Sequence, residues 1–178
     1  MHRNQLCVLL ENYYPNDPDE KMSKQKMLQF LETYTDCFER SCIPGHFTGS
    51  SWLLNKDGSQ VLLLLHKKFN VWLQPGGHCD GDSDMLRVAI KEAKEESGIM
   101  DIKPVFESIF DIDVHFVSAY GNDPAHYHYD VRFLLQVQST ETLICSSESH
   151  DLGWFGKDKN TLPNQTRAVV RMFEKGIT

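Results

Sequence analysis

Apolar residues near the N-terminus recur every three or four positions, which is the spacing of one face of an α-helix. The first such stretch ends at Pro15. A second begins after Asp17, which suits the N-cap, while Pro18 suits the first turn and Glu20 completes a capping box. The apolar positions are Leu6, Leu9, Leu10 and Tyr13, then Met27, Leu31, Tyr34 and Phe38. The pattern predicts two helices within residues 1–42.

Beyond residue 43 the pattern changes to short apolar runs separated by turn residues, which is typical of β-strands. The runs that predict extended segments lie at 47–54, 61–65, 71–73, 102–117, 126–138 and 154–155. A turn at 55–58 predicts that the first two runs pair as a hairpin. Helical spacing returns at about 83–97 and about 163–175. Strands interleaved with helices predict an α/β fold in which a mixed sheet lies between helices.

The length of 178 residues suits one domain with an additional segment. We therefore expect an N-terminal helical extension at 1–42 and a main domain at 43–178. The two helices of the extension can pack on the main domain or form a homodimer. The sequence does not choose between these arrangements.

Charge and cysteine content narrow the range of partners. The net charge is −7 and the pI is near 5.6, whereas proteins that bind nucleic-acid polymers need a basic surface. The longest strongly apolar run, at 61–65, is far too short to cross a bilayer. The 5 cysteines are scattered and include no CxxC pair, which favours a reducing compartment. These features predict a cytoplasmic protein with a small-molecule substrate and no membrane partner.

The most informative segment is a loop rich in Gly and Asp that leads into an acidic helix. Glu92, Glu95 and Glu96 are three and four residues apart, so their carboxylates share one helical face. Carboxylates gathered in this way repel one another unless a cation lies among them, and Mg²⁺ prefers oxygen ligands. Gly76 and Gly77 allow the backbone to approach a metal or a phosphate closely. The segment therefore predicts metal-assisted chemistry on a phosphorylated substrate.

Residues 77–99 resemble the Nudix box, which is the signature of a family of hydrolases. The positions in register are Gly77, Glu92, Ala93, Glu95, Glu96, Gly98 and Ile99. Two positions depart from the pattern, because Ser83 stands in place of a Glu and Lys91 in place of an Arg. In the family these two residues usually pair as a brace. We expect Asp82 or Asp84 to pair with Lys91 instead, and Asp82 or Ser83 to cap the helix.

The resemblance implies a Nudix α/β/α sandwich and a reaction. Glu92, Glu95 and Glu96 would be the metal ligands, with Mg²⁺ as the ion and Mn²⁺ as an alternative. The enzyme would cleave a diphosphate (pyrophosphate) linkage in a nucleoside diphosphate derivative by attack of water. Glu92 and Glu95 are catalytic candidates, and Glu148 is another because several Nudix enzymes use a Glu in the loop before a Trp-containing strand. Glu95 and Glu148 are the candidates for the general base.

A second group of polar residues lies on the predicted strand at 126–138. His126, His128 and Asp130 alternate along the strand and so share one face, and Arg132 continues it. His115, on the preceding strand, can lie alongside. Three interpretations stay open for the histidines: a Zn²⁺ or transition-metal site, a substrate pocket in which His126 and His128 contact phosphate, or a hydrogen-bonded polar face. Arg132 is a candidate phosphate clamp, because a guanidinium pairs bidentately with phosphate oxygens.

Two further functions remain as alternatives to the hydrolase. A non-catalytic nucleotide-binding module would fit the departures at Ser83 and Lys91. An isopentenyl-diphosphate isomerase would share the scaffold, but the chain has no clear match to the catalytic Cys motif of that enzyme.

The aromatic residues Trp52, Phe69 and Trp72 can stack on a nucleobase, although a place in the core suits each of them better.

Overall fold

The structure is a computed structural model and describes residues 2–139, 141–156 and 158–176. The helices in these ranges are α1 (Asn4–Asn12), α2 (Pro18–Thr33), α3 (Met85–Ser97), α4 (Arg167–Gly176) and the 3-10 helix η1 (Lys159–Thr161). The strands are β1 (Gly45–Leu54), β2 (Gln60–His66), β3 (Val71–Leu73), β4 (Gly76–His78), β5 (Ile102–Pro104), β6 (Asp111–Val117), β7 (His126–Val137) and β8 (Ser149–Gly156).

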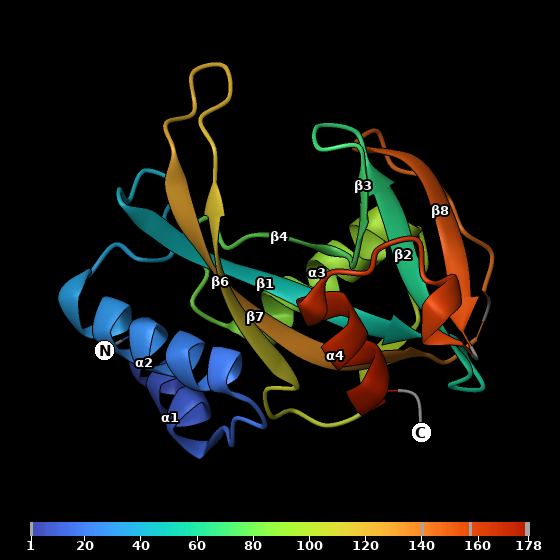
Figure 1. The fold of residues 1–178 in the computed structure, drawn as a ribbon, viewed down its shortest axis with the longest axis horizontal. Helices are drawn as coiled ribbons and strands as arrows, with labels where there is room; N and C mark the ends of the chain where they lie inside the picture. The colour runs from blue at the N-terminus through green and yellow to red at the C-terminus, as the bar shows by residue number, and fades with distance from the viewer. Residues whose placement is uncertain (1, 140, 157, 177–178) are drawn as a thin grey trace.

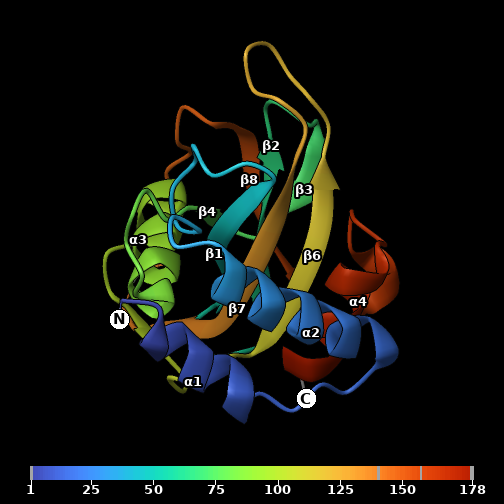
Figure 2. The ribbon, with the colours of Figure 1, turned by 90° about the vertical axis from the view of Figure 1, so that its left-hand side faces the viewer.

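The strands form one curled mixed sheet of 8 strands with β1 near its centre (Figure 1). Its main path runs β3-β2-β1-β7-β5, and β4, β6 and β8 pair with β1, β7 and β2, respectively. The long central pair, β1 and β7, is parallel, and the other recorded pairs are antiparallel. Figure 2 shows α3 on one side of this sheet and α4 on the other.

Both faces of the sheet are packed against helices. On one face, Phe47, Leu53 and Phe133 join the larger apolar cluster, which includes residues of α1, α2 and α3. On the opposite face, Trp52 and Leu134 join a smaller cluster with residues of α4. We call these the α3 face and the α4 face. The predicted α/β/α sandwich is confirmed.

The N-terminal helices pack on the rest of the chain. The predicted capping box at the start of α2 is present, with Asp17 accepting from the backbone of Glu20 and the Glu20 side chain accepting in return. Leu6 and Leu10 of α1 are fully buried in the larger cluster. The division into an extension at 1–42 and a domain at 43–178 stays a prediction, as does homodimer formation.

Several predicted elements differ in extent from those observed. The expected hairpin is real only at its turn, because β1 and β2 pair at Leu54 and Val61 and then separate towards other partners. The extended segment predicted at 102–117 is divided into β5 and β6. Both are antiparallel to β7 and follow it in the same direction, and residues 105–110 interrupt the pairing between them. The last strand is longer than predicted and pairs with β2 along its length.

No helix within the described ranges is long and apolar enough to cross a membrane. The cytoplasmic location stays a prediction.

Candidate active site

The loop before α3 is held by an aspartate pair that differs from the predicted one. Asp84 caps the helix by accepting from the backbone N–H of Arg87, so the prediction of Asp82 or Ser83 as the cap is wrong. Asp82 accepts from the backbone of Asp84 and from the Arg87 guanidinium. The prediction that Asp82 or Asp84 pairs with Lys91 is also wrong. Arg87, in the first turn of the helix, forms the ion pairs with both aspartates instead.

Lys91 points along the helix towards the glutamates. Its ammonium lies 3.0 Å from Glu92 and 3.3 Å from Glu95. The glutamates differ in exposure, because the Glu92 side chain is 13% exposed, that of Glu95 58%, and the whole residue Glu96 only 5%. Glu96 is therefore a carboxylate held in the protein interior, whereas Glu95 reaches solvent.

The glycine loop lies directly against these carboxylates. The backbone N–H of Gly76 donates to Glu96 Oε2 at 2.8 Å. A Cβ added to Gly77 would lie 2.4 Å from Glu92 Oε2, closer than real Cβ contacts allow. Any larger residue at position 77 would displace the Glu92 carboxylate from the loop. The sequence thus brings backbone and carboxylates together at one place beside the central strand.

The carboxylates act on one another. Burial raises the pKa of Glu96 to about 8, and the charges of Glu92, Glu148 and Glu95 add to this effect against the Gly76 hydrogen bond. Burial also raises the pKa of Glu92, to which Glu95 and Glu148 contribute against the opposing effect of Lys91. Glu148 precedes β8 in the chain, and its carbonyl is held by the backbone N–H of Lys67. Glu148 is therefore near enough for its charge to act on Glu92 and Glu96, and we call Glu92, Glu95, Glu96 and Glu148 the glutamate cluster.

The glutamate cluster has the donor chemistry of a Mg²⁺ or Mn²⁺ site. Its ligands would be carboxylate oxygens, which hard divalent cations prefer. In the described part of the chain, the ion pairs of this cluster with a protein cation are those of Lys91 with Glu92 and Glu95. The buried Glu96 has a backbone N–H but no cationic partner within ion-pair distance among these residues. The residues fit a divalent cation, because such an ion would neutralise the negative charge of the cluster that Lys91 alone does not balance.

Arg40 is a residue near this site that the sequence analysis missed. Its guanidinium forms a bidentate pair with Asp80, and the charges of Glu92 and Glu148 also raise its pKa, after the leading effect of the Asp80 hydrogen bond. Its side chain is 60% exposed, which leaves it open to a ligand. No local signal marks Arg40, because Glu39 to Ser41 reads as an ordinary polar loop.

Arg132 lies in a different environment from the one expected of a phosphate clamp. Its side chain is 4% exposed and forms ion pairs with Asp111, Asp113 and Asp130. Asp111 is also bound by Arg171 of α4. We call these five residues the aspartate network. The geometry disfavours a contact between Arg132 and substrate, and that role stays a prediction.

The predicted histidines do lie together, and two others join them. Nε2 of His126 and Nε2 of His128 are 3.0 Å apart. His46 of β1 and His78 of β4 lie next to them, with ring centroids 5.0 Å and 5.2 Å from that of His128. Asp130 is not part of this group, because it accepts from the hydroxyls of Thr48 and Ser50. We call His46, His78, His126 and His128 the histidine cluster.

Position on the sheet explains why the two clusters are separate. The Cβ direction of Gly77 points towards Glu92 of α3, so the neighbouring His78 points to the other face of β4. His115, also predicted for this group, forms a hydrogen bond with Asp113, although its ring lies 5.5 Å from that of His128. The two clusters therefore lie against opposite faces of the sheet.

The aromatic residues proposed for base stacking mostly belong to the core. Trp52 is fully buried, and Trp72 packs edge-on against Phe155. Phe69 is 47% exposed beside His66. Of the three, Phe69 alone presents its ring to solvent.

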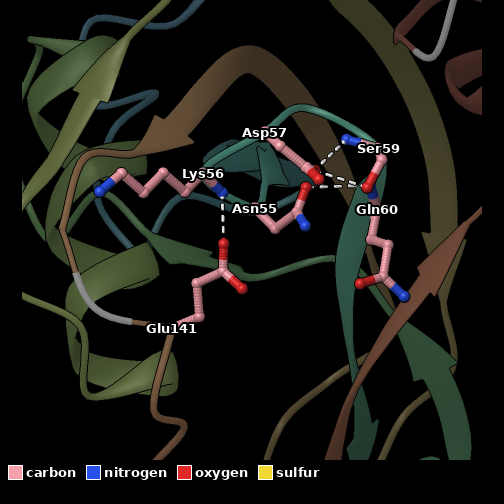
Figure 3. Close-up of a pocket in the computed structure, with 6 residues that line it drawn as sticks. All are labelled: Asn55, Lys56, Asp57, Ser59, Gln60 and Glu141. Carbon is pink, nitrogen blue, oxygen red and sulfur yellow. Dashed lines mark hydrogen bonds between the residues drawn. The ribbon is translucent and has the colours of Figure 1, made fainter.

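A surface hollow of about 690 Å³ lies away from both clusters, at the turn between β1 and β2 (Figure 3). Its lining residues are Asn55, Lys56, Asp57, Ser59, Gln60 and Glu141. Hydrogen bonds hold them in place, including one from the Lys56 N–H to Glu141, which is distant in the chain, at 2.8 Å. This is a braced turn, and it shares no residue with the glutamate cluster.

Comparison with known proteins identifies the family. The family model of the NUDIX domain matches residues 48–173, which is more than half of the chain. The chain belongs to the Nudix family. The Nudix reaction class, hydrolysis of a phosphoric anhydride, confirms the predicted class of enzyme. No curated protein matches the chain in sequence.

Solved Nudix structures share its fold. A hydrolase of the NUDIX family from Clostridium perfringens is 27% identical, with a TM-score of 0.54 over 73% of this chain and 95% of that one. An Ap4A hydrolase from C. elegans, in a binary complex, is 20% identical, with a TM-score of 0.58 over 72% of this chain and 93% of the other. A MutT NUDIX hydrolase from Burkholderia pseudomallei is 23% identical, with a TM-score of 0.54 over 74% and 97%.

Proposed function

We propose that this Nudix protein hydrolyses a pyrophosphate linkage in a nucleoside diphosphate derivative, with Mg²⁺ bound by Glu92, Glu95 and Glu96. The observation that carries the proposal is the glutamate cluster itself. Glu92 and Glu96 lie against the glycine loop, and the charges of Glu95 and Glu148 act on both. Among the described residues, Lys91 is the cation that pairs with this cluster, and it pairs with Glu92 and Glu95 only. A divalent ion would balance the remaining negative charge of the cluster and could bind the phosphates of a substrate at the same time.

The chain's own residues would each have a distinct part in the reaction. Bound Mg²⁺ would neutralise phosphate charge and lower the pKa of a coordinated water. Glu96 is fixed by the Gly76 N–H and Glu92 by Lys91, so both carboxylates are oriented before a ligand arrives. Such fixed geometry favours a reactive arrangement.

Proton transfer from water requires a carboxylate that solvent can reach. Glu95 and Glu148 are both exposed, whereas Glu96 is buried and bound to the loop. We therefore retain Glu95 and Glu148 as the candidates for the general base. Arg40 is a better candidate for a phosphate contact than Arg132, because it is exposed and lies near Glu92 and Glu148.

Phosphate release from a panel of nucleoside diphosphate derivatives, measured with Mg²⁺, tests the proposal. We expect Glu95→Gln and Glu96→Gln each to lower kcat/KM by about 100-fold or more, because each removes a ligand charge while conserving shape. Glu107→Gln is the matched control, since Glu107 is an exposed glutamate outside the cluster. Nucleotide binding without turnover, unchanged in these variants, would instead identify a non-catalytic module.

The isomerase alternative gains no support from the cysteine nearest the loop. Cys79 is 4% exposed and donates to the Phe47 carbonyl. Burial raises the pKa of its thiol, which keeps the sulfur protonated and away from a substrate.

A further inference from the structure

The α4 face of the two central strands changes in character along its length. At one end, Trp52 and Leu134 pack beneath α4. At the other end, the same face carries His46 on β1 and His128 on β7, which are direct partners in the parallel ladder. His78 joins from β4, whose register pairs it with Thr48, two residues along from His46. Three separate strands therefore place imidazoles on one small area of sheet.

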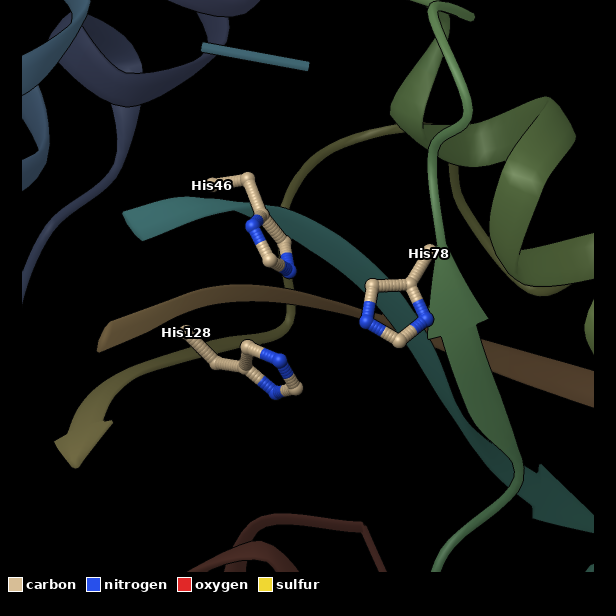
Figure 4. A group of neighbouring side chains, drawn as sticks. All are labelled: His46, His78 and His128. Atoms are coloured by element: carbon tan, nitrogen blue, oxygen red, sulfur yellow. The ribbon is translucent and has the colours of Figure 1, made fainter. Parts of the chain in front are cut away.

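The three rings face a common space (Figure 4). One nitrogen from each of His46, His78 and His128 lies within 4.8 Å of the others. A tetrahedral ion with metal–nitrogen bonds of about 2.0–2.1 Å requires nitrogens about 3.4 Å apart. Rotation of the three side chains would have to close this difference when an ion binds. His126, whose Nε2 is 3.0 Å from that of His128, is placed to supply a fourth nitrogen.

His46 provides an independent indication that something is bound here. It is 3% exposed, and neither of its ring nitrogens makes a hydrogen bond of ordinary geometry to any described residue. A buried polar group without a partner costs about 1–3 kcal/mol. The Cys42 carbonyl lies close enough to act on the ring, and a backbone carbonyl is a usual partner for the second nitrogen of a metal-bound histidine.

The protonation state of the rings suits a metal. Burial, reinforced by neighbouring cationic groups, lowers the pKa of His46 and of His78 to about 4. Burial and the other histidines lower that of His128 to about 2. Neutral imidazole is the form that ligates metals, so these rings are ready to bind near pH 7.

We propose that His46, His78 and His128 form a second metal site, for a late first-row transition ion such as Zn²⁺. The ligand set is made of imidazole nitrogen, which suits Zn²⁺, Cu²⁺ and Ni²⁺ and not the oxygen-seeking Mg²⁺. His126 or water occupies the fourth position. The site is distinct from the glutamate cluster, because its ligands project from the α4 face, whereas Glu92 and Glu96 belong to α3.

Zn²⁺ binding measured by calorimetry, after chelator treatment, tests the site. The full chain would first carry Glu92→Gln, Glu95→Gln and Glu96→Gln together, which removes the three helix carboxylates proposed to bind Mg²⁺. In this background we expect one Zn²⁺ per chain, and visible absorption typical of tetrahedral coordination when Co²⁺ replaces Zn²⁺.

His46→Gln and His128→Gln are then added one at a time. Each is expected to weaken Zn²⁺ binding by about 100-fold or more and to abolish the Co²⁺ spectrum. His150→Gln is the matched control, because His150 is an exposed histidine that is not part of the histidine cluster. This variant is expected to leave the Zn²⁺ affinity and the Co²⁺ spectrum unchanged. Far-UV circular dichroism confirms the fold of each variant. His128 is less buried than His46, so His128→Gln keeps the test valid if His46→Gln does not fold.

Two results would overturn the proposal. Zn²⁺ binding that survives both His46→Gln and His128→Gln would place the ion elsewhere. Absence of Zn²⁺ binding in the triple glutamine background, with the fold intact, would show that the histidines hold no metal. Neither result bears on Mg²⁺-dependent hydrolysis, which is tested separately by the glutamate variants.

Discussion

Two groups of carboxylates in this protein are both partly buried, yet they are neutralised in different ways. In the aspartate network, Arg132 and Arg171 pair with Asp111, and Arg132 also pairs with Asp113 and Asp130. In the glutamate cluster, the protein's own pairing cation is Lys91, which bonds to Glu92 and Glu95. Protein cations therefore balance the charges of the aspartate network, whereas Lys91 alone does not balance those of the glutamate cluster.

The pKa values move in opposite directions for this reason. Burial alone would raise the pKa of Asp113, but the His115 hydrogen bond and the charge of Arg132 outweigh it and bring the value to about 2. Burial raises the pKa of Glu96 to about 8, and the negative charges nearby add to the rise where no protein cation offsets them. A group of acidic residues therefore does not by itself indicate a metal site. What indicates one is a group of acidic residues with too few protein cations nearby to balance their charge.

Arg132→Met gives the largest expected effect, since it leaves three aspartates partly uncompensated. Removing one partner of a buried ion pair costs about 3–5 kcal/mol, so the free energy of unfolding in urea should fall by that amount. Arg87→Met is the control, because its pairs with Asp82 and Asp84 are exposed and such pairs contribute below about 1 kcal/mol. Equal losses in the two variants would contradict the distinction.

Asp113→Asn sharpens the comparison through pH. The pKa of Asp113 is about 2 in the folded protein, below the usual 3.8, so the ionised carboxylate stabilises the fold. This stabilisation is complete above pH 3.8 and is lost as the pH falls towards 2. We expect wild type to exceed the variant by about 2 kcal/mol near pH 7 and by about half as much near pH 3. Urea unfolding at both pH values measures the difference. A gap that did not change with pH would show that the charge of Asp113 contributes nothing.

Glu96→Gln should have the opposite sign and a smaller size. In chelator, near pH 7.5, the variant should be about 1–2 kcal/mol more stable than wild type. With a folded-state pKa of about 8, the wild-type Glu96 must take up a proton on folding that the unfolded chain has released, whereas Gln needs none. Mg²⁺ at about ten times its Kd should then stabilise wild type by about 1.4 kcal/mol and the variant much less. Thermal unfolding with and without Mg²⁺ measures both. A variant less stable than wild type in chelator would show that Glu96 is structurally satisfied without an ion.

The sequence by itself determined the local features. Helical spacing located α2, α3 and their apolar faces, and Asp17 with Glu20 marked the start of α2. Glu92 and Glu96 share a face because the helix repeat alone fixes their separation. The register of Gly77 with these glutamates followed from the box. Such features depend on neighbours within a few residues, which the sequence displays directly.

The tertiary structure decided which distant residues meet. Arg132 is enclosed because the antiparallel register places Asp111 opposite it and Asp113 opposite Asp130. His46 and His78 join His128 because β1 lies between β4 and β7. Arg40 pairs with Asp80 and lies within range of the charges of Glu92 and Glu148, from a loop with no local signal. Strand order and register depend on contacts between segments far apart in the chain, and a periodic pattern within one strand contains no information about which partner lies beside it.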